Sequence, residues 1–358
     1  MALKAGSTIG ILGGGQLGRM LAMAAARLSY RVAIFDPDKN APAAQVANAH
    51  IVAAYDDAAA LQAFAKQCDV VTYEFENVPV AAANLIEEIA PVYPKPNALE
   101  AAQDRVTEKR SLNTIGVETA PFNTVDTIHE LLNALSAFGG SGVLKTRRFG
   151  YDGKGQAVLK NASNHEAATA FAALGGKALI LEGLVPFVAE ISVIAARGLD
   201  GQIKAYDPAR NVHRDGILAS STLPAGVSEH TKQMAFASAK AILIALNYVG
   251  IIGVEFFVLE SGALLVNEIA PRVHNSGHWT EAACSISQFE QHIRAISGLP
   301  LGDPARHSDC LMENLIGFDV DKVPALALES NVCIHLYGKA EPREGRKMGH
   351  FTRLLARV

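Results

Sequence analysis

A glycine-rich turn between an apolar strand and a helix is the feature that most constrains the fold of this chain. The turn contains Gly13, Gly15 and Gly18 in a GxGxxG pattern, and it follows a buried strand predicted at residues 8–12. A helix is predicted directly after it, at residues 16–28. Strands and helices alternate over the first hundred residues, which is typical of a parallel sheet with helices on both faces. The further elements predicted there are strands at 31–35, 51–53 and 70–73 and a helix at 57–67.

The same turn predicts a binding site for an anion. Glycines let the backbone approach a phosphate, and the N–H groups at the start of a helix attract it. Asp36 ends the second strand, at the place where an acidic residue holds the ribose in dinucleotide-binding proteins. Binding of a nicotinamide or flavin dinucleotide, binding of a sugar phosphate, and a tight turn without a ligand all remain open at this point.

Composition disfavours several classes of protein. The 358 residues allow two or three domains of roughly 100–200 residues each, and a chain that is 49% hydrophobic is not mainly disordered. The net charge of −4 disfavours a protein that coats nucleic acid. No stretch predicts a signal peptide or a membrane span, since the most apolar one, residues 241–254, is too short. The four cysteines form no CxxC pair, which indicates a reduced, cytoplasmic protein without a structural zinc.

Beyond the first hundred residues the pattern changes. Three prolines at residues 91–96 interrupt any helix and indicate a linker. A single helix is predicted after them, at residues 98–115. The later elements predicted are a helix at 165–173 and strands at 178–182, 253–260, 263–269 and 332–337.

A second glycine-rich stretch lies between short strands predicted at residues 142–145 and 156–159. It contains three glycines, follows Lys145 and includes a further lysine, Lys154. No helix opens with the GK[ST] sequence of a Walker motif, so a P-loop is not predicted. We interpret the stretch as a flap whose N–H groups and lysines contact the phosphates of a nucleotide. A flexible surface turn with solvated charges is the alternative.

Two glutamates are predicted to face each other across a hairpin. A two-residue turn at residues 261–262 pairs Glu260 with Ala263 and therefore places Glu255 directly opposite Glu268. Two ionised carboxylates at ~5 Å repel by roughly 3 kcal/mol at an effective dielectric of about 20. Either one acid is protonated or a cation lies between them, and such oxygen ligands suit a Mg²⁺ ion that also contacts phosphates. A salt-bridged pair without a ligand is the alternative.

An ordered set of residues resembles the ATP-grasp superfamily, namely Lys145, the loop Gly150–Gln156, Glu182–Val185, Glu190, Glu255 and Asn267-Glu268. Four stretches resemble more closely the 5-(carboxyamino)imidazole ribonucleotide synthase family of purine biosynthesis: GGGQLGRM, RRFGYDGKGQ, NEIAPRVHNSGHWTEAACSISQFEQHIRAI and GRKMGH. The resemblance covers nearly the whole chain and implies a mixture of α/β and α+β architecture. It implies a Rossmann-like parallel-sheet domain at 1–97, a two-part ATP-grasp domain at 98–297 with a mobile lid at about 118–182, and a small β-rich C-terminal domain at 298–358.

The resemblance also implies a role for individual residues. ATP would be bound by Arg105, Lys145, Gly150, Tyr151, Asp152, Gly153, Lys154, Gly155, Gln156, Glu182, Gly183, Leu184, Val185, Glu190, His213, Asn267 and Glu268. Mg²⁺ would be bound by Glu255 and Glu268. Aminoimidazole ribonucleotide would be bound by Gln16, Leu17, Glu74, Asn275, Lys339, Arg346 and Lys347. The carboxylation centre would be formed by Asp152, Lys154, Arg272 and His274.

The implied reaction uses ATP and bicarbonate to form carboxyphosphate and then carboxylates the exocyclic amine of 5-aminoimidazole ribonucleotide. The implied protein is a cytoplasmic homodimer with no nucleic-acid or membrane partner. Three alternatives remain open. The GxGxxG pattern and Asp36 favour a nicotinamide-dependent oxidoreductase. The flap and the paired acids also fit a formate-using purine transformylase, or a regulatory nucleotide-binding protein without turnover.

Overall fold

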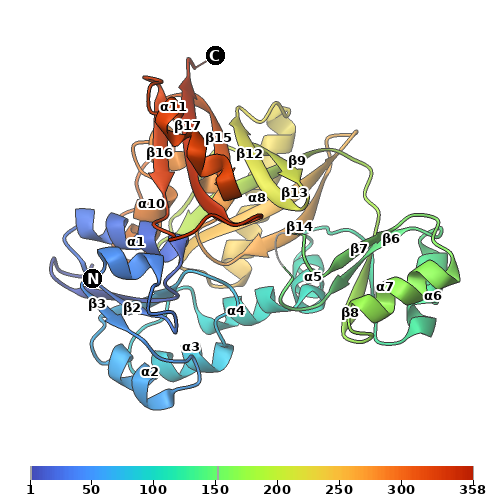
Figure 1. Ribbon diagram of the computed structural model, residues 1–358, viewed down its shortest axis with the longest axis horizontal. Coiled ribbons are helices and arrows are strands. Elements are labelled where there is room, and N and C mark those ends of the chain that lie inside the picture. The colour runs from blue at the N-terminus through green and yellow to red at the C-terminus, as the bar shows by residue number, and fades with distance from the viewer. Residues whose placement is uncertain (1, 151–152, 358) are drawn as a thin grey trace.

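The structure is a computed structural model that describes residues 2–150 and 153–357, and these residues form three β-sheets with helices packed on them (Figure 1). In Figure 1 the N-terminal sheet lies at the lower left, the sheet of β5 to β8 at the right and the C-terminal strands at the top. No helix in the described ranges is both long and apolar enough to cross a membrane.

The N-terminal sheet is parallel, as the alternating pattern predicts. Its four strands pair in the order β3-β2-β1-β4. An apolar cluster on one face includes residues of helix α1, and a cluster on the other face includes residues of helices α2 and α3. Strand β3 lies two residues earlier than predicted. The elements are β1 (Thr8–Leu12), α1 (Gln16–Arg27), β2 (Arg31–Phe35), the 3₁₀ helix η1 (Pro42–Val46), β3 (Ala49–Ile51), α2 (Ala58–Ala65), β4 (Val70–Tyr73) and α3 (Val80–Glu87).

The single helix predicted at residues 98–115 is wrong, because the chain breaks it at Asp104. The structure has two helices instead, α4 (Pro96–Gln103) and α5 (Arg105–Thr114). The backbone of Asp104 is extended, and its carboxylate accepts hydrogen bonds from two N–H groups in the first turn of α5. Such an N-cap satisfies N–H groups that have no partner inside the helix. The break places Arg105 at the start of a new helix.

Residues 122–183 form a second, four-stranded sheet with the antiparallel order β5-β8-β6-β7. The predicted flap joins β6 to β7 as a hairpin, and the N–H of Thr146 donates to the carbonyl of Gly155 at 2.8 Å. This unit projects from the rest of the chain in Figure 1. Its elements are β5 (Phe122–Val125), α6 (Ile128–Ala137), β6 (Gly142–Thr146), β7 (Gln156–Leu159), α7 (Asn164–Ala173) and β8 (Leu179–Gly183).

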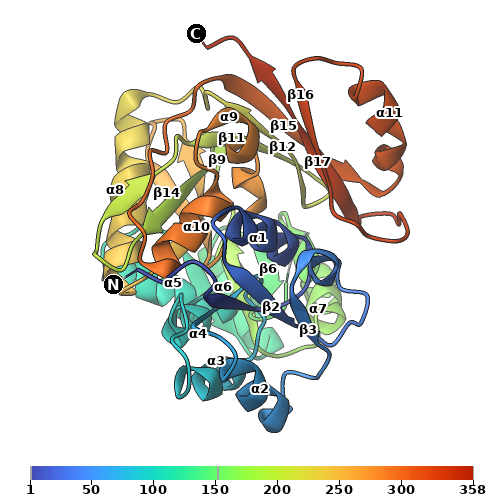
Figure 2. The ribbon, with the colours of Figure 1, turned by 90° about the vertical axis from the view of Figure 1, so that its left-hand side faces the viewer.

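The third sheet has nine strands, in the order β14-β13-β9-β11-β12-β15-β17-β16 with β10 on the side of β9. Its last three strands come from residues predicted to form a small C-terminal domain, and they continue the sheet through the pairing of β15 with β12. Figure 2 shows these C-terminal strands beside α9 and β12. The domain bounds themselves stay a prediction.

The elements of this part of the chain follow in sequence order. The strands are β9 (Phe187–Arg197), β10 (Ile203–Ala205), β11 (Ala209–Arg214), β12 (Ile217–Leu223), β13 (Gly250–Leu259), β14 (Leu264–Ala270), β15 (Asp309–Ile316), β16 (Val332–Leu336) and β17 (Lys347–Leu355). The helices are α8 (Glu229–Ala245), η2 (Asn275–Gly277), α9 (Thr280–Ala283), α10 (Gln288–Ser297), η3 (Gly317–Lys322) and α11 (Val323–Leu326).

Candidate active site

Glu255 on β13 lies directly opposite Glu268 on β14, as the sequence predicts. The prediction of a two-residue turn, from which this register was inferred, is wrong, however. The N–H of Leu259 donates to the carbonyl of Ala263 at 2.9 Å, so three residues rather than two connect the strands. This difference shifts the register by one residue near the turn. A β-bulge further along the hairpin shifts it back, and the predicted pair is restored.

The bulge residue is Asn267. Phe256 pairs with Val266, and the next pair is Glu255 with Glu268, so Asn267 has no residue opposite it. A bulge reverses the alternation of side chains on one strand. Val266 therefore packs with Phe256 in the apolar core, while Glu268 faces the same side as Glu255.

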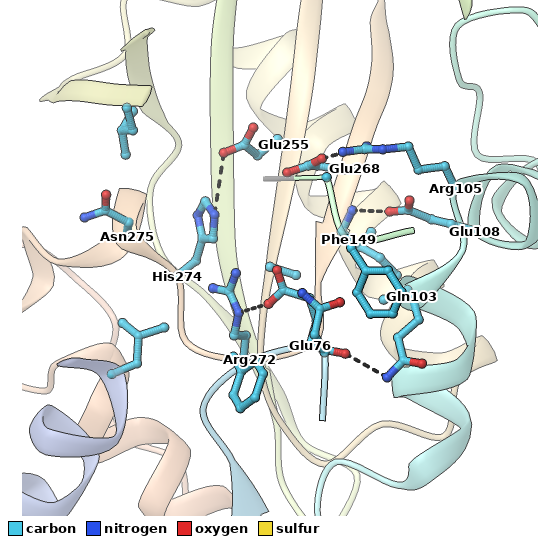
Figure 3. A pocket seen from close by; sticks show the side chains of 18 of the residues that line it. Glu76, Gln103, Arg105, Glu108, Phe149, Glu255, Glu268, Arg272, His274 and Asn275 are labelled. Carbon is cyan, nitrogen blue, oxygen red and sulfur yellow. Dashed lines mark hydrogen bonds and ion pairs between the residues drawn. The ribbon is translucent and has the colours of Figure 1, made fainter. Parts of the chain in front are cut away.

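The two glutamates line a cavity of about 530 Å³ where the N-terminal sheet, the flap and the large sheet meet (Figure 3). Twelve residues named from the sequence line it: Gln16, Leu17, Glu74, Arg105, Gly150, His213, Glu255, Glu268, Arg272, His274, Asn275 and Lys347. These residues come from segments far apart in the chain. The fold therefore brings both predicted metal ligands and five of the seven predicted ribonucleotide-binding residues to one place.

Two basic side chains contact the paired acids. Nη1 of Arg105 lies 3.0 Å from Oε2 of Glu268, and Nε2 of His274 lies 3.7 Å from Oε1 of Glu255. Burial and the neighbouring charge of Glu268 raise the pKa of Glu255 to about 7. Burial alone would raise the pKa of Glu268 too, but Arg105 lowers it. Burial and the charge of Arg272 lower the pKa of His274 to about 3, so its imidazole is neutral.

The same acids fit a divalent cation. Asn267, which precedes Glu268 in the chain, has a buried Oδ1 with no hydrogen-bond partner within the described residues, although it does not line the cavity. Carboxylate and amide oxygens are the ligands that Mg²⁺ prefers. A cation would also favour the ionised form of Glu255. The predicted metal ligands Glu255 and Glu268 therefore have the chemistry that their proposed role needs.

The N–H groups of the glycine-rich turn bind carboxylates of the protein itself. The N–H groups of Gly15 and Gly18 donate to Glu74, the second at 2.6 Å, and the N–H of Gly14 donates to Asp36 at 2.6 Å. Free N–H groups at the start of a helix favour negatively charged acceptors, and here two carboxylates of the chain take that place. In this structure the acceptors are side chains of the protein, so these N–H groups are already used and do not favour the dinucleotide over the other two alternatives left open by the sequence.

The residues predicted to bind ATP fall into two groups. Arg105, Gly150, His213 and Glu268 line the cavity, and Nδ1 of His213 lies 3.0 Å from Oε2 of Glu190. A second group does not line it, namely Lys145, Gly153, Lys154, Gly155, Gln156, Glu182, Gly183, Leu184, Val185, Glu190 and Asn267. Tyr151 and Asp152 lie outside the described residues.

Within the second group, Lys145 and Glu182 form a buried ion pair. Nζ of Lys145 donates to Oε2 of Glu182 at 2.9 Å, and Nζ of Lys109 lies 3.4 Å from the other carboxylate oxygen. Burial lowers the pKa of Lys145 in spite of this partner. The flap glycine Gly153 has a φ of +74°, and an added Cβ would lie 2.9 Å from Gly216, so the flap packs closely on the turn between β11 and β12.

Three basic residues predicted to bind the ribonucleotide are placed differently. Lys347 lines the cavity, whereas Lys339 and Arg346 do not. Nζ of Lys339 donates to the carbonyl of Lys347 at 2.8 Å, and Nη1 of Arg346 donates to the carbonyl of Glu341 at 2.9 Å. Of this set, the geometry supports a direct role in the cavity for Lys347.

Sequence reasoning missed several residues of the cavity, among them Glu76, Gln103, Glu108 and Phe149 (Figure 3). Glu76 follows the end of a parallel strand, where binding sites are common, and this signal could have found it. Glu108 is buried on α5 and accepts the N–H of Ile269 at 2.5 Å. Burial and Glu268 raise the pKa of Glu108 to about 8. Nothing in the helical pattern distinguishes it from a solvated acid.

Three family models match the chain in succession. The ribonucleotide synthetase preATP-grasp domain matches residues 6–103, and the ATP-grasp domain matches residues 110–289. The C-terminal domain of phosphoribosylaminoimidazole carboxylase matches residues 310–357.

Whole proteins resemble the chain over its full length. It is 60% identical over 357 residues to N5-carboxyaminoimidazole ribonucleotide synthase of Brucella melitensis. The match covers 100% of this chain and 99% of the Brucella protein. A structure of an N5-carboxyaminoimidazole ribonucleotide synthetase with ADP has a TM-score of 0.96 at 41% identity and covers 100% of this chain and 94% of the other. The enzyme of Aspergillus clavatus with ADP and 5-aminoimidazole ribonucleotide has a TM-score of 0.92 at 31% identity, covering 98% and 94%. The chain therefore belongs to the N5-carboxyaminoimidazole ribonucleotide synthase family of ATP-grasp ligases.

Proposed function

We propose that this protein uses ATP and bicarbonate to carboxylate the exocyclic amine of 5-aminoimidazole ribonucleotide in purine biosynthesis. The products are N5-carboxyaminoimidazole ribonucleotide, ADP and phosphate. The observation that supports this most is the cross-strand pair of Glu255 and Glu268 in one cavity with Arg272, His274 and Lys347. This reaction needs carboxylates that bind a metal ion, a guanidinium group that binds an oxyanion, and a lysine that binds a phosphate.

In this proposal ATP lies between the flap and the large sheet. Glu255 and Glu268 would bind Mg²⁺, with Arg105 and Lys145 beside the phosphates. When bound, Mg²⁺ neutralises charge on the phosphates during phosphoryl transfer. The Glu182–Val185 segment and Glu190 would contact the nucleoside. The flap, which contains Gly150–Gly155, would close over the bound ATP and keep water away from the acyl phosphate.

Arg272 is the proposed binding residue for bicarbonate and for the carboxylate of carboxyphosphate. A guanidinium group binds planar oxyanions through two parallel hydrogen bonds. The γ-phosphoryl group of ATP passes to a bicarbonate oxygen. The substrate amine then attacks the carbon, a C–N bond forms, the bond from carbon to the phosphate oxygen breaks, and phosphate leaves.

The amine loses one proton in this step. Asp152, His274 and the released phosphate are the three candidate acceptors. The pKa of His274, which burial and Arg272 lower to about 3, makes its imidazole a weak base and favours the other two. Lys154 would stabilise charge near the same centre. Gln16, Leu17, Glu74, Asn275 and Lys347 would hold the ribonucleotide, with Lys339 and Arg346 near its phosphate. A homodimer and a cytoplasmic location remain expectations from the family.

An ADP-release assay tests the function. ADP release is expected when aminoimidazole ribonucleotide, MgATP and bicarbonate are all present. When the bicarbonate carries an isotopic label, the label should appear in the carbamate product. Formate-dependent ADP release without bicarbonate would favour the transformylase. Quenching of NADH fluorescence without ADP release would favour the oxidoreductase, and ATP binding without any turnover would favour a regulatory protein.

A further inference from the structure

A cluster of three side chains outside the proposed active site has the composition of a metal site. Glu281 lies on α9, His335 on β16 and His350 on β17. One nitrogen or oxygen atom of each lies within 4.8 Å of the others. Strands β16 and β17 are at one end of the large sheet, and Figure 2 shows the helix α9 beside this part of the sheet. None of the three residues lines the cavity of the active site.

His350 is prepared for a ligand on one of its two ring nitrogens. Its side chain is buried, with 1% of the residue exposed, and Nδ1 lies 2.9 Å from the hydroxyl of Tyr337. Nε2 has no hydrogen-bond partner in the part of the chain that the structure describes. Histidines that bind metals use this arrangement, because a hydrogen bond at one nitrogen fixes the ring and leaves the other free to coordinate.

Glu281 offers a second unsatisfied atom. Its Oε2 is buried without a hydrogen-bond partner among the described residues and lies 3.7 Å from Nδ1 of His335. The Glu281 and His335 side chains are 20% and 25% exposed, so an ion can enter from solvent on this side. An ion pair between these two alone would leave Nε2 of His350 unsatisfied. A cation among all three would satisfy both atoms.

We propose that Glu281, His335 and His350 bind a divalent transition-metal ion, with Zn²⁺ as the best match. Two imidazoles and one carboxylate are typical zinc ligands, and a water molecule completes a tetrahedral site. Ligand atoms in such a site lie about 3.4 Å apart. The three atoms here lie within 4.8 Å of one another and the rings of His335 and His350 are stacked, so these rings have to turn toward the ion as it binds. The expectation of no structural zinc rested on the cysteines, and this site uses none of them.

The position of the ion suggests what it does. His350 lies three residues after Lys347 on β17, and Lys347 lines the active-site cavity. The ion would link this strand and its neighbour β16 to α9. It would therefore act as a structural brace that holds the strand of Lys347 in place, without taking part in the reaction.

Equilibrium dialysis of the full chain against Zn²⁺, with saturating Mg²⁺ and ADP present, tests this site. The wild type is expected to bind one zinc per chain, and Co²⁺ in its place should give the visible absorption of a tetrahedral ion. Glu281→Gln and His335→Asn should each weaken binding by about tenfold or more. Zinc should also raise the melting temperature of the wild type and not that of Glu281→Gln.

Two controls separate this site from others. His230→Gln changes an exposed histidine on α8 and should leave zinc binding unchanged. Glu268→Gln removes a proposed magnesium ligand and should leave it unchanged as well. Equal zinc binding in the wild type and Glu281→Gln, or loss of the zinc in Glu268→Gln, would overturn the proposal whether or not the proposed function holds.

Discussion

The carboxylate of Glu76 accepts a hydrogen bond from Nε of Arg272, and this ion pair joins the loop after β4 to the loop after β14 (Figure 3). Both side chains line the active-site cavity. Nη1 of the same guanidinium donates to the carbonyl of Val273 at 3.0 Å. The glutamate thus positions the group that we propose to bind bicarbonate.

Glu76→Gln is expected to raise the KM for bicarbonate, because Arg272 loses the partner that orients it. The value of kcat, measured at saturating bicarbonate, should fall by a smaller factor. Leaving a buried charge without its partner should also cost roughly 3 kcal/mol of stability at neutral pH. Steady-state kinetics and urea unfolding measure the two effects. An unchanged KM for bicarbonate would show that Glu76 does not position Arg272 for this ligand.

The stability difference between wild type and Glu76→Gln should depend on pH. Burial alone would raise the pKa of Glu76, but Arg272 lowers it from 4.5 to about 2. A depressed carboxyl pKa stabilises the folded state above the unfolded pKa, and this contribution is lost as the pH falls toward the folded value. The difference should shrink by roughly 1 kcal/mol between about pH 6 and about pH 3.5. Glu329→Gln, at an exposed ion pair with Arg353, is the matched control and should have little effect at either pH.

Glu268→Gln should abolish ADP formation, with a fall of about a hundredfold or more in kcat, since an amide is a poor replacement for a carboxylate ligand of Mg²⁺. The melting temperature should stay near that of the wild type, because the loss of the ion pair with Arg105 is offset by relief of the repulsion between Glu268 and Glu255. Glu260→Gln, in the turn of the same hairpin, is the control and should keep full activity. Normal ADP release by Glu268→Gln at ordinary Mg²⁺ would contradict the metal assignment.

Lys347→Ala should raise the KM for aminoimidazole ribonucleotide by about tenfold and change kcat little, because the lysine would contact a part of the substrate that does not react. Initial rates over a range of ribonucleotide concentrations measure this effect. Arg343→Ala removes an exposed cation nearby and should have no such effect. If KM stays the same in Lys347→Ala, the residue does not bind the substrate.

The sequence predicts the elements of this fold well where the pattern is local. The parallel N-terminal sheet follows from apolar strands that alternate with helices, and the hairpin of Glu255 and Glu268 follows from two apolar strands around a turn. The pair itself was predicted through two errors that cancel: a turn one residue too short and an unforeseen bulge at Asn267. A bulge depends on how the strand packs against the core, and the pattern of β14 alone does not reveal it.

The cavity residues that were predicted are those that a motif or the family resemblance marks. Glu74 was named, yet its bonds to the glycine-rich turn were not foreseen, because they join residues 56 and 59 positions apart in the chain. Glu76 and Glu108 belong to no motif that physical reasoning recognises. Their roles arise from partners, Arg272 and Ile269, that tertiary folding brings to them.

Asp104 explains the largest error in the predicted elements and supports a last prediction. Its carboxylate caps α5 and also binds two arginines before the flap, Arg147 at 2.9 Å and Arg148 at 3.5 Å. Asp104→Asn keeps an acceptor for the cap but loses the charge, whereas Asp104→Ala loses both. We therefore expect Asp104→Ala to be less stable than Asp104→Asn by about 1 kcal/mol in urea unfolding. Both variants should raise the KM for ATP, because Arg147 lines the cavity and both lose the charge that holds it. Equal stability of the two variants would mean that the N-cap of Asp104 contributes nothing. The break between the two helices would then be stabilised by the ion pairs with the arginines alone.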